Sequence, residues 1–116
     1  MKLLTKAIET KLKANSIKSQ GVGGADFQRT VKPVVKLFNP SGGATWLLSE
    51  MDDNGIMFGL CDLGMGSPEL GYVALHELEE VRGAFGLGIE RDIHWDADKS
   101  LTEYSDVAYK KQYIVA

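Results

Sequence analysis

The run FGLCDLGMGSPELGYV, at residues 58–73, combines residue types that can do chemistry. It holds the chain's one cysteine, Cys61, which is followed by an aspartate. A cysteine nucleophile needs a histidine within hydrogen-bonding reach, and His76 and His94 are available. If residues 56–63 form a strand, however, Cys61 shares a face with apolar neighbours, where burial raises a thiol pKa and makes it unreactive. We therefore predict a structural role for Cys61 and assign no catalytic residue.

A second group of candidates alternates along a predicted strand near residue 90. One face of that strand would carry three carboxylates and an imidazole, from Glu90, Asp92, His94 and Asp96. Such a face could hold a divalent cation, and the metal could activate water for phosphodiester attack. The spacing of oxygen-bearing side chains over residues 92–103 also resembles that of a calcium-binding loop, but Ala97 stands where that loop needs its glycine. We expect a solvated strand face, and a metal-dependent hydrolase or nuclease is the alternative hypothesis.

Two further motifs fail on their spacing. A zinc-protease helix needs a second histidine four residues after the first, and Glu80 stands there relative to His76. The glycines of residues 64–71 lack the lysine and hydroxyl residue of a phosphate-binding loop. We expect an exposed helix face and a turn, respectively.

Charge is divided unevenly along the chain, although the net formal charge is only −3. Residues 1–36 carry eight Lys or Arg and two acids, whereas residues 37–116 carry five and 14. The basic segment can attract nucleic acid or an acidic protein, or it can lie against its own acidic body. The candidate contacts with DNA or a partner are Lys18, Arg29, Lys32 and Lys36. The acidic body also suits a DNA mimic, although such mimics are expected to carry denser acidic runs.

The elements that would position these residues begin with a helix. Apolar residues recur at helical spacing over residues 3–14, and Asn15 is its predicted stop. Residues 16–32 are polar and contain several glycines, which predicts a long loop. We expect residues 1–36, a basic helix and loop, and residues 37–116, an acidic α+β body, to form one domain.

Three apolar runs then predict strands separated by turns, at residues 34–38, 44–51 and 56–63. The Asn-Gly pair within residues 52–55 favours a tight hairpin. Residues 72–75 fit either a fourth strand or the lead-in to a helix. The prediction is an α+β fold with a meander core, in which an antiparallel sheet of four to five strands has short helices packed on one face.

The remaining sequence predicts two helices and a strand. A helix over residues 76–82 would be closed by Gly83, and a final strand would follow at residues 86–95. Ser100 and Glu103 match a capping box, which predicts the start of a second helix. The tail would either add an edge strand or fray.

The amino-acid composition narrows the classes of protein to which the chain can belong. A lone cysteine suits a reducing compartment, because it cannot form an internal disulfide. No apolar run resembles a signal peptide or approaches the roughly 20 residues of a membrane span. The hydrophobic fraction of 44% is ordinary for a globular domain. We expect a cytoplasmic protein without a cofactor or a membrane partner, and the sequence leaves the oligomeric state open.

Three runs also resemble a bacterial family of domains of unknown function, DUF2958. They are LFNPSGGATWLLSEMD, FGLCDLGMGSPELGYVALHELEEVRG and GLGIERDIHWDADKSLTEY. The resemblance covers residues 37–104. It implies small proteins, or modules of larger ones, carried by plasmids, conjugative elements and phages beside DNA-processing and anti-restriction genes. It implies no activity, and no functional residue is carried over from it.

Together, the charge asymmetry and the family setting favour a non-enzymatic accessory protein of a mobile genetic element. Such a protein would bind a host or element protein, or DNA, in transfer, anti-restriction or another anti-defence role.

Overall fold

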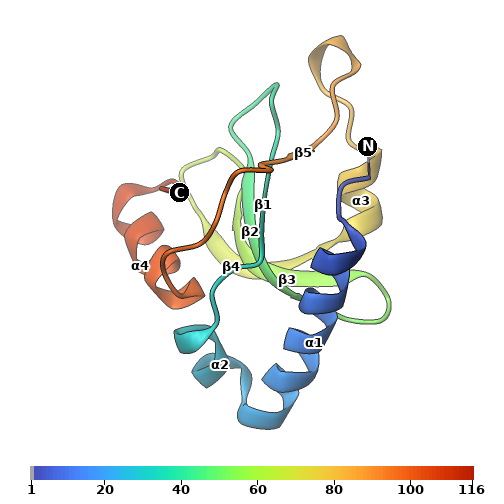
Figure 1. Cartoon of the computed structure of the whole chain (residues 1–116). Helices are drawn as coiled ribbons and strands as arrows, with labels where there is room; N and C mark the ends of the chain where they lie inside the picture. The colour runs from blue at the N-terminus through green and yellow to red at the C-terminus, as the bar shows by residue number, and fades with distance from the viewer. Residues whose placement is uncertain (1) are drawn as a thin grey trace.

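Within residues 2–116, which a computed structural model describes, the chain folds around a sheet of five strands (Figure 1). The strands are β1 (Val35–Phe38), β2 (Thr45–Met51), β3 (Ile56–Asp62), β4 (Glu69–Ala74) and β5 (Glu90–Arg91). The helices are α1 (Lys6–Val22), α2 (Gly24–Thr30), α3 (Leu75–Glu80) and α4 (Leu101–Lys111), and the 3-10 segment η1 spans Ala84–Gly86. The predicted α+β class with an antiparallel sheet is confirmed.

The strands pair in the order β4-β3-β2-β1-β5, and each pair is antiparallel. Strands β1 to β3 therefore form the predicted meander, β4 extends it, and β5 joins it beside β1. In the turn between β2 and β3, Asp52 Oδ1 accepts hydrogen bonds from the N–H groups of Asn54 and Ile56, at 2.8 and 2.9 Å. Gly55 has a φ of 80°, which glycine adopts without strain. The predicted Asn-Gly turn is thus built as its residue types favour.

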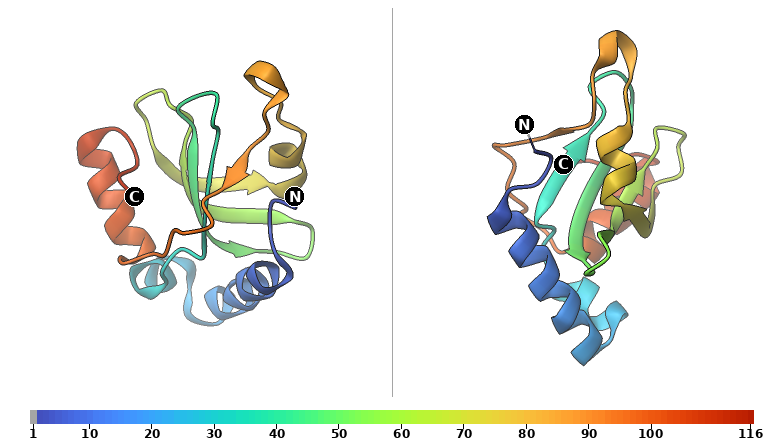
Figure 2. Two further views of the ribbon diagram at one scale, coloured as in Figure 1. Left: turned by 45° about the horizontal axis from the view of Figure 1, so that its top comes forward. Right: turned by 90° about the vertical axis from the view of Figure 1, so that its right-hand side faces the viewer.

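Helices cover both faces of the sheet, whereas the sequence predicted cover on one face. One face packs under α1 and α3, in a cluster that includes Leu12, Leu37, Leu48, Met57 and Leu78. The other face packs under α4, in a cluster of Leu47, Leu60, Leu101, Tyr104 and Ala108. Figures 1 and 2 show the sheet between these two layers. The reason is visible in β2, where consecutive apolar residues point to opposite faces and both must be buried.

Helix α1 continues to Val22, past the stop predicted at Asn15. The Asn15 side chain is buried, and its Nδ2 donates a hydrogen bond to the carbonyl of Ser49 on β2 at 2.9 Å. Ser19 is buried on the same helix. The polar residues that resembled a helix end therefore face the sheet, and this packing overrides their weak helix propensity.

The long loop predicted for residues 16–32 is wrong. Most of that segment is helical, because α1 runs through its first part and α2 through most of the rest. The break between the two helices is Gly23, which has a φ of 88°. Phe27 anchors α2 in the interior. The glycines thus mark a sharp corner between helices rather than an extended loop.

The second half of the chain also departs from the prediction. Strand β4 begins at Glu69, inside the expected turn, and α3 ends at Glu80, before the expected closure at Gly83. The Arg82 guanidinium donates to the carbonyls of Glu79 and Val81, at 2.8 and 2.7 Å. A basic side chain thus satisfies carbonyls at the helix end in place of a glycine cap.

The final strand is much shorter than the predicted span of residues 86–95. Strand β5 ends at Arg91, and Asp92 then donates its N–H to the carbonyl of Lys36 at 3.0 Å. The chain turns at once, since the N–H of Trp95 donates to the Asp92 carbonyl at 3.3 Å. Alternating residue types therefore did not correspond to extended backbone here.

Helix α4 begins at the predicted capping box. Ser100 Oγ accepts from the Glu103 N–H at 3.2 Å, and Glu103 Oε1 accepts from the Ser100 N–H at 3.0 Å. The tail after α4 is not an edge strand. It is held by hydrogen bonds from the N–H of Ile114 to Asp62 Oδ2 and from Lys36 Nζ to the carbonyl of Ala116, at 3.0 and 3.1 Å.

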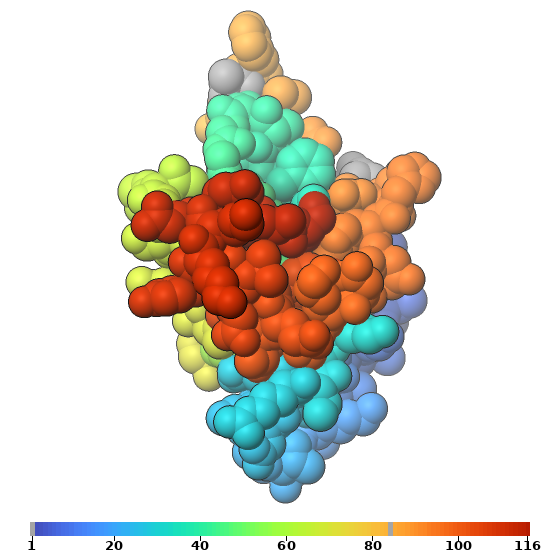
Figure 3. Space-filling view, turned by 90° about the vertical axis from the view of Figure 1, so that its left-hand side faces the viewer, coloured from blue at the N-terminus to red at the C-terminus, as the bar shows by residue number. Residues whose placement is uncertain are grey.

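Figure 3 shows α4 and the tail lying together over one side of the molecule, with α2 below them. No helix in residues 2–116 has both the length and the apolar composition that a membrane crossing requires.

Candidate functional site

Cys61 lies on β3 and packs against the larger core cluster. Burial raises the pKa of its thiol to about 11. The pocket that Cys61 borders has no histidine among its described lining residues. The neighbouring Asp62 is buried and accepts hydrogen bonds from the N–H groups of Gly64 and Ile114. This pocket thus lacks the histidine that a cysteine nucleophile needs, and a structural role remains our prediction for Cys61.

The four candidates for a metal site do not line a strand face, because β5 ends at Arg91. These candidates are Glu90, Asp92, His94 and Asp96. Asp92 instead forms an ion pair with Lys36 at 3.7 Å, and its Oδ1 accepts a hydrogen bond from the N–H of His94 at 3.2 Å. Across residues 2–116, no three His, Cys, Asp or Glu side chains are placed to share a metal ion. The predicted strand face, which the hydrolase hypothesis required, does not form, so that prediction is wrong.

The basic candidates divide into two places. Lys18 on α1, Arg29 on α2 and Lys32 just after α2 are exposed. Arg29 forms an exposed ion pair with Asp26 at 3.7 Å. Lys36 lies apart on β1, where its Nζ contacts Asp92 and the tail. Three of the four candidates thus belong to the same helical region, and the fourth is engaged within the fold.

The structure adds a feature at the opposite edge of the sheet, where β4 is the last strand. Leu75, directly after β4, donates its N–H to the carbonyl of Gly55 at 2.9 Å. Backbone groups of an antiparallel strand point alternately toward and away from its partner. Gly71 therefore points its backbone groups at β3, whereas Leu70 and Tyr72 point theirs outward. Within the described chain, no strand pairs with that outer side.

Strand β4 has only one of the features that usually protect a sheet edge, which is the exposed charge of Glu69 at its start. Protective features include short length, bulges, lysine and proline. The strand reads ELGYVA, and its pairing with β3 is unbroken from Glu69 to Ala74. The other edge strand, β5, is only two residues long. The β5 edge is therefore too short to pair with another chain over any length, whereas the β4 edge presents a full-length strand.

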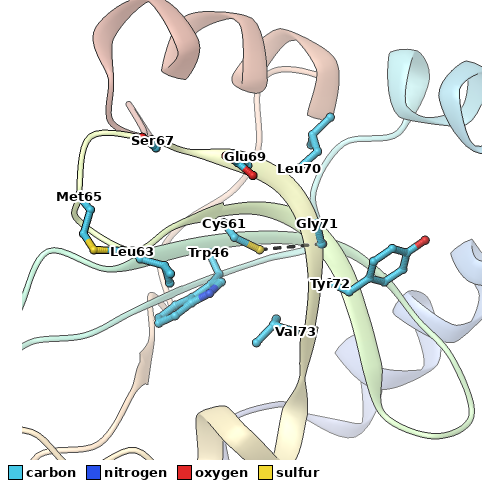
Figure 4. Close-up of a pocket in the computed structure, with 10 residues that line it drawn as sticks. All are labelled: Trp46, Cys61, Leu63, Met65, Ser67, Glu69, Leu70, Gly71, Tyr72 and Val73. Atoms are coloured by element: carbon cyan, nitrogen blue, oxygen red, sulfur yellow. Dashed lines mark hydrogen bonds between the residues drawn. The ribbon is translucent and has the colours of Figure 1, made fainter.

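An apolar pocket of about 460 Å³ lies beside β4 (Figure 4). Its apolar walls come from two central strands, the loop between β3 and β4, and β4 itself, through Trp46, Cys61, Leu63, Met65 and Val73. Leu63 and Met65 are 58% and 77% exposed, so this loop presents large apolar side chains to solvent. A free strand edge beside an apolar pocket is the arrangement used for binding by strand addition.

The sequence pattern does not reveal this edge. Residues 64–71 resemble a turn, and residues 72–75 fit either a strand or the lead-in to a helix. The available signal was the apolar run at Leu70, Tyr72 and Val73, which β4 contains. Which strand ends the sheet depends on strand order, which a local pattern does not report.

Comparison of the chain with known proteins gives one match. The model of a family described as "Protein of unknown function (DUF2958)" matches residues 3–115. No curated protein and no solved structure matches the chain.

Proposed function

The chain belongs to the DUF2958 family, and we propose that it is a binding protein that adds an extended segment of a protein partner to its sheet at β4. The observation that carries the proposal is the free six-residue edge strand. The outward N–H and C=O groups of Leu70 and Tyr72 are the hydrogen-bonding partners for the added strand. Such main-chain bonds supply affinity, and adjacent pockets supply specificity.

Exposed apolar side chains support the same surface. Leu63 and Met65 on the loop before β4 are largely exposed beside the pocket, and Tyr72, which is 74% exposed, points to the opposite face of the same edge. An apolar patch of this kind on a protein surface marks interaction sites. An added strand would cover part of this patch, and the burial contributes about 25 cal/mol per Å² of apolar surface.

We also propose that the partner is a protein of a mobile genetic element or of its host. The support is the setting of plasmids and phages that the family resemblance implies. In that setting, a small protein that captures an extended segment can block or recruit a component of DNA transfer or restriction. The role needs no catalytic group on this chain.

The experiment is a selection of random twelve-residue peptides displayed on phage against the full chain. Selected peptides are then measured in solution by fluorescence polarisation. We expect Tyr72→Pro to weaken binding at least tenfold, because proline removes an outward N–H and is tolerated on a sheet edge. Tyr72→Ala, which keeps that N–H, is the matched control and should retain more of the affinity. Tyr109→Ala, an exposed tyrosine on α4, should change nothing.

Amide hydrogen exchange provides the decisive readout. Bound peptide should protect the amides of Leu70 and Tyr72, which point outward in the free protein. Binding that leaves both amides unprotected would place the peptide elsewhere and overturn the proposal, as would a selection that yields no binder. If the two amides are already protected in a dimer of the free chain, the edge serves a second copy instead.

DNA binding by the α1–α2 region is the second candidate function. It is favoured by the exposed basic side chains of Lys18 and Lys32, for which the described residues show no ion pair. The acidic composition of residues 37–116 confines such binding to that region.

A further inference from the structure

On the sheet face opposite the apolar pocket, three side chains form a row that ends at the free edge. Glu50 on β2 stands opposite Phe58 on β3, and Phe58 stands opposite Tyr72 on β4. The ring centroids of Phe58 and Tyr72 are 4.9 Å apart. This row borders a recess of about 410 Å³, which Asp52 and the C-terminal part of α1 also line. We call it the acidic recess.

The negative charge of the acidic recess is not balanced within the described residues. Glu50 and Asp52 both line it, and no Lys or Arg does. Glu50 also takes part in no ion pair among residues 2–116. Burial raises the pKa of the Glu50 carboxyl, although a hydrogen bond from Ser19 acts to lower it. A half-buried carboxylate without a counter-charge is unfavourable, and a cation in the recess would offset that cost.

We propose that the acidic recess receives an arginine or lysine side chain from the strand that pairs with β4. The proposal rests on the proposed function and adds the chemistry of the partner. A long cationic side chain laid across the ring face of Tyr72, which is tilted by 60° from the Phe58 ring, approaches Glu50 beyond it. Cations bind such faces, and the planar arginine side chain stacks on them best.

The two faces of the sheet at β4 then favour different residue types at alternate positions of the added strand. Successive side chains of an added strand point to opposite faces of the sheet. The residue opposite Tyr72 lies over the acidic recess, and its neighbours lie over the apolar pocket at Trp46 and Met65. The preferred partner is therefore an extended segment in which basic and apolar residues alternate. The excess of acids over bases in residues 37–116 favours the same partner.

The test uses three acetylated eight-residue peptides in which valine alternates with arginine, lysine or the neutral arginine analogue citrulline. Binding to the full chain is measured by fluorescence polarisation. We expect the arginine peptide to bind at least tenfold more tightly than the citrulline peptide, with lysine between them. Glu50→Gln should remove most of the preference for arginine over citrulline. Glu69→Gln removes the same charge from the other face of β4 and should keep the preference.

A second measurement separates this inference from the proposed function. N-acetylarginine methylamide, which cannot add as a strand, is titrated into the protein by NMR, and we expect shifts at Glu50 and Tyr72. Equal binding of the arginine and citrulline peptides overturns the cation preference and leaves edge binding intact. Shifts with the small probe but no peptide binding support the recess and refute strand addition. Absence of both effects refutes both.

Discussion

Gly59 and Gly71 stand directly opposite each other on β3 and β4, but only Gly71 has room for a side chain. A Cβ on Gly59 would collide with the carbonyl oxygen of Leu47 and would lie 2.7 Å from the Cα of Leu48. The bulge in β2 lies beside this contact, where the register shifts after Leu48. A Cβ on Gly71 would meet no atom within 4 Å. The first glycine allows backbone packing, and the second borders the apolar pocket.

Gly59→Ala should therefore destabilise the fold by about 2–3 kcal/mol, because an added methyl group in a packed interior forces the backbone apart. Gly71→Ala should stay within about 0.5 kcal/mol of the parent. Urea unfolding followed by circular dichroism measures both. Similar stabilities for the two variants would show that β2 relaxes away from β3 at little cost.

The Cys61 thiol should react slowly at neutral pH, because with a pKa of about 11 only about one thiol in ten thousand is ionised at pH 7. A raised pKa means that the folded chain holds the proton more tightly than the unfolded chain. This contribution to stability is complete below pH about 9 and is lost as pH rises toward 11. Labelling with a thiol reagent between pH 7 and 10, in native and urea-unfolded protein, measures the effect. Equal rates in the two states at pH 7 would contradict it.

Ser100→Ala should cost about 1 kcal/mol, because it leaves the N–H of Glu103 without its capping oxygen. The backbone N–H and the hydroxyl of Ser100 lower the pKa of the Glu103 carboxyl. The folded chain thus favours the ionised form, so this stabilisation is present above the usual carboxyl range and is lost as pH falls through it. Glu103→Gln should flatten that acid limb in thermal unfolding between pH 3 and 7. An unchanged pH profile would refute the linkage.

A calcium-dependent rise in melting temperature that Ser100→Ala abolishes would revive the metal-loop hypothesis.

Any binding to DNA should depend on the α1–α2 region. Replacing Lys18, Arg29 and Lys32 with alanine should weaken binding and flatten its salt dependence, since each phosphate contact contributes about 0.7–0.9 to the slope. Fluorescence anisotropy at several salt concentrations measures both quantities. Replacing Lys110 and Lys111 at the end of α4 is the control. Tight DNA binding that the triple variant retains would exclude this region as the contact surface.

The sequence alone determined the elements whose signals are local. The capping box of Ser100 and Glu103, the Asp-Asp-Asn-Gly hairpin and the three central strands were each predicted within a few residues. Each of these signals acts between residues close together in the chain. The sequence also placed Cys61 on an apolar strand face, because side-chain alternation is a local property as well.

Tertiary structure decided the outcome wherever a local sequence signal conflicted with long-range packing. Asn15 resembled a helix stop, but burial against the carbonyl of Ser49 carries α1 past it. The alternating acids after Glu90 resembled a strand, but only the residues that pair with β1 are extended. Strand order also put β4 at the edge and brought Glu50, Phe58 and Tyr72 into one row across three strands. These residues lie on three different strands, so the candidate binding site arises only when the sheet forms.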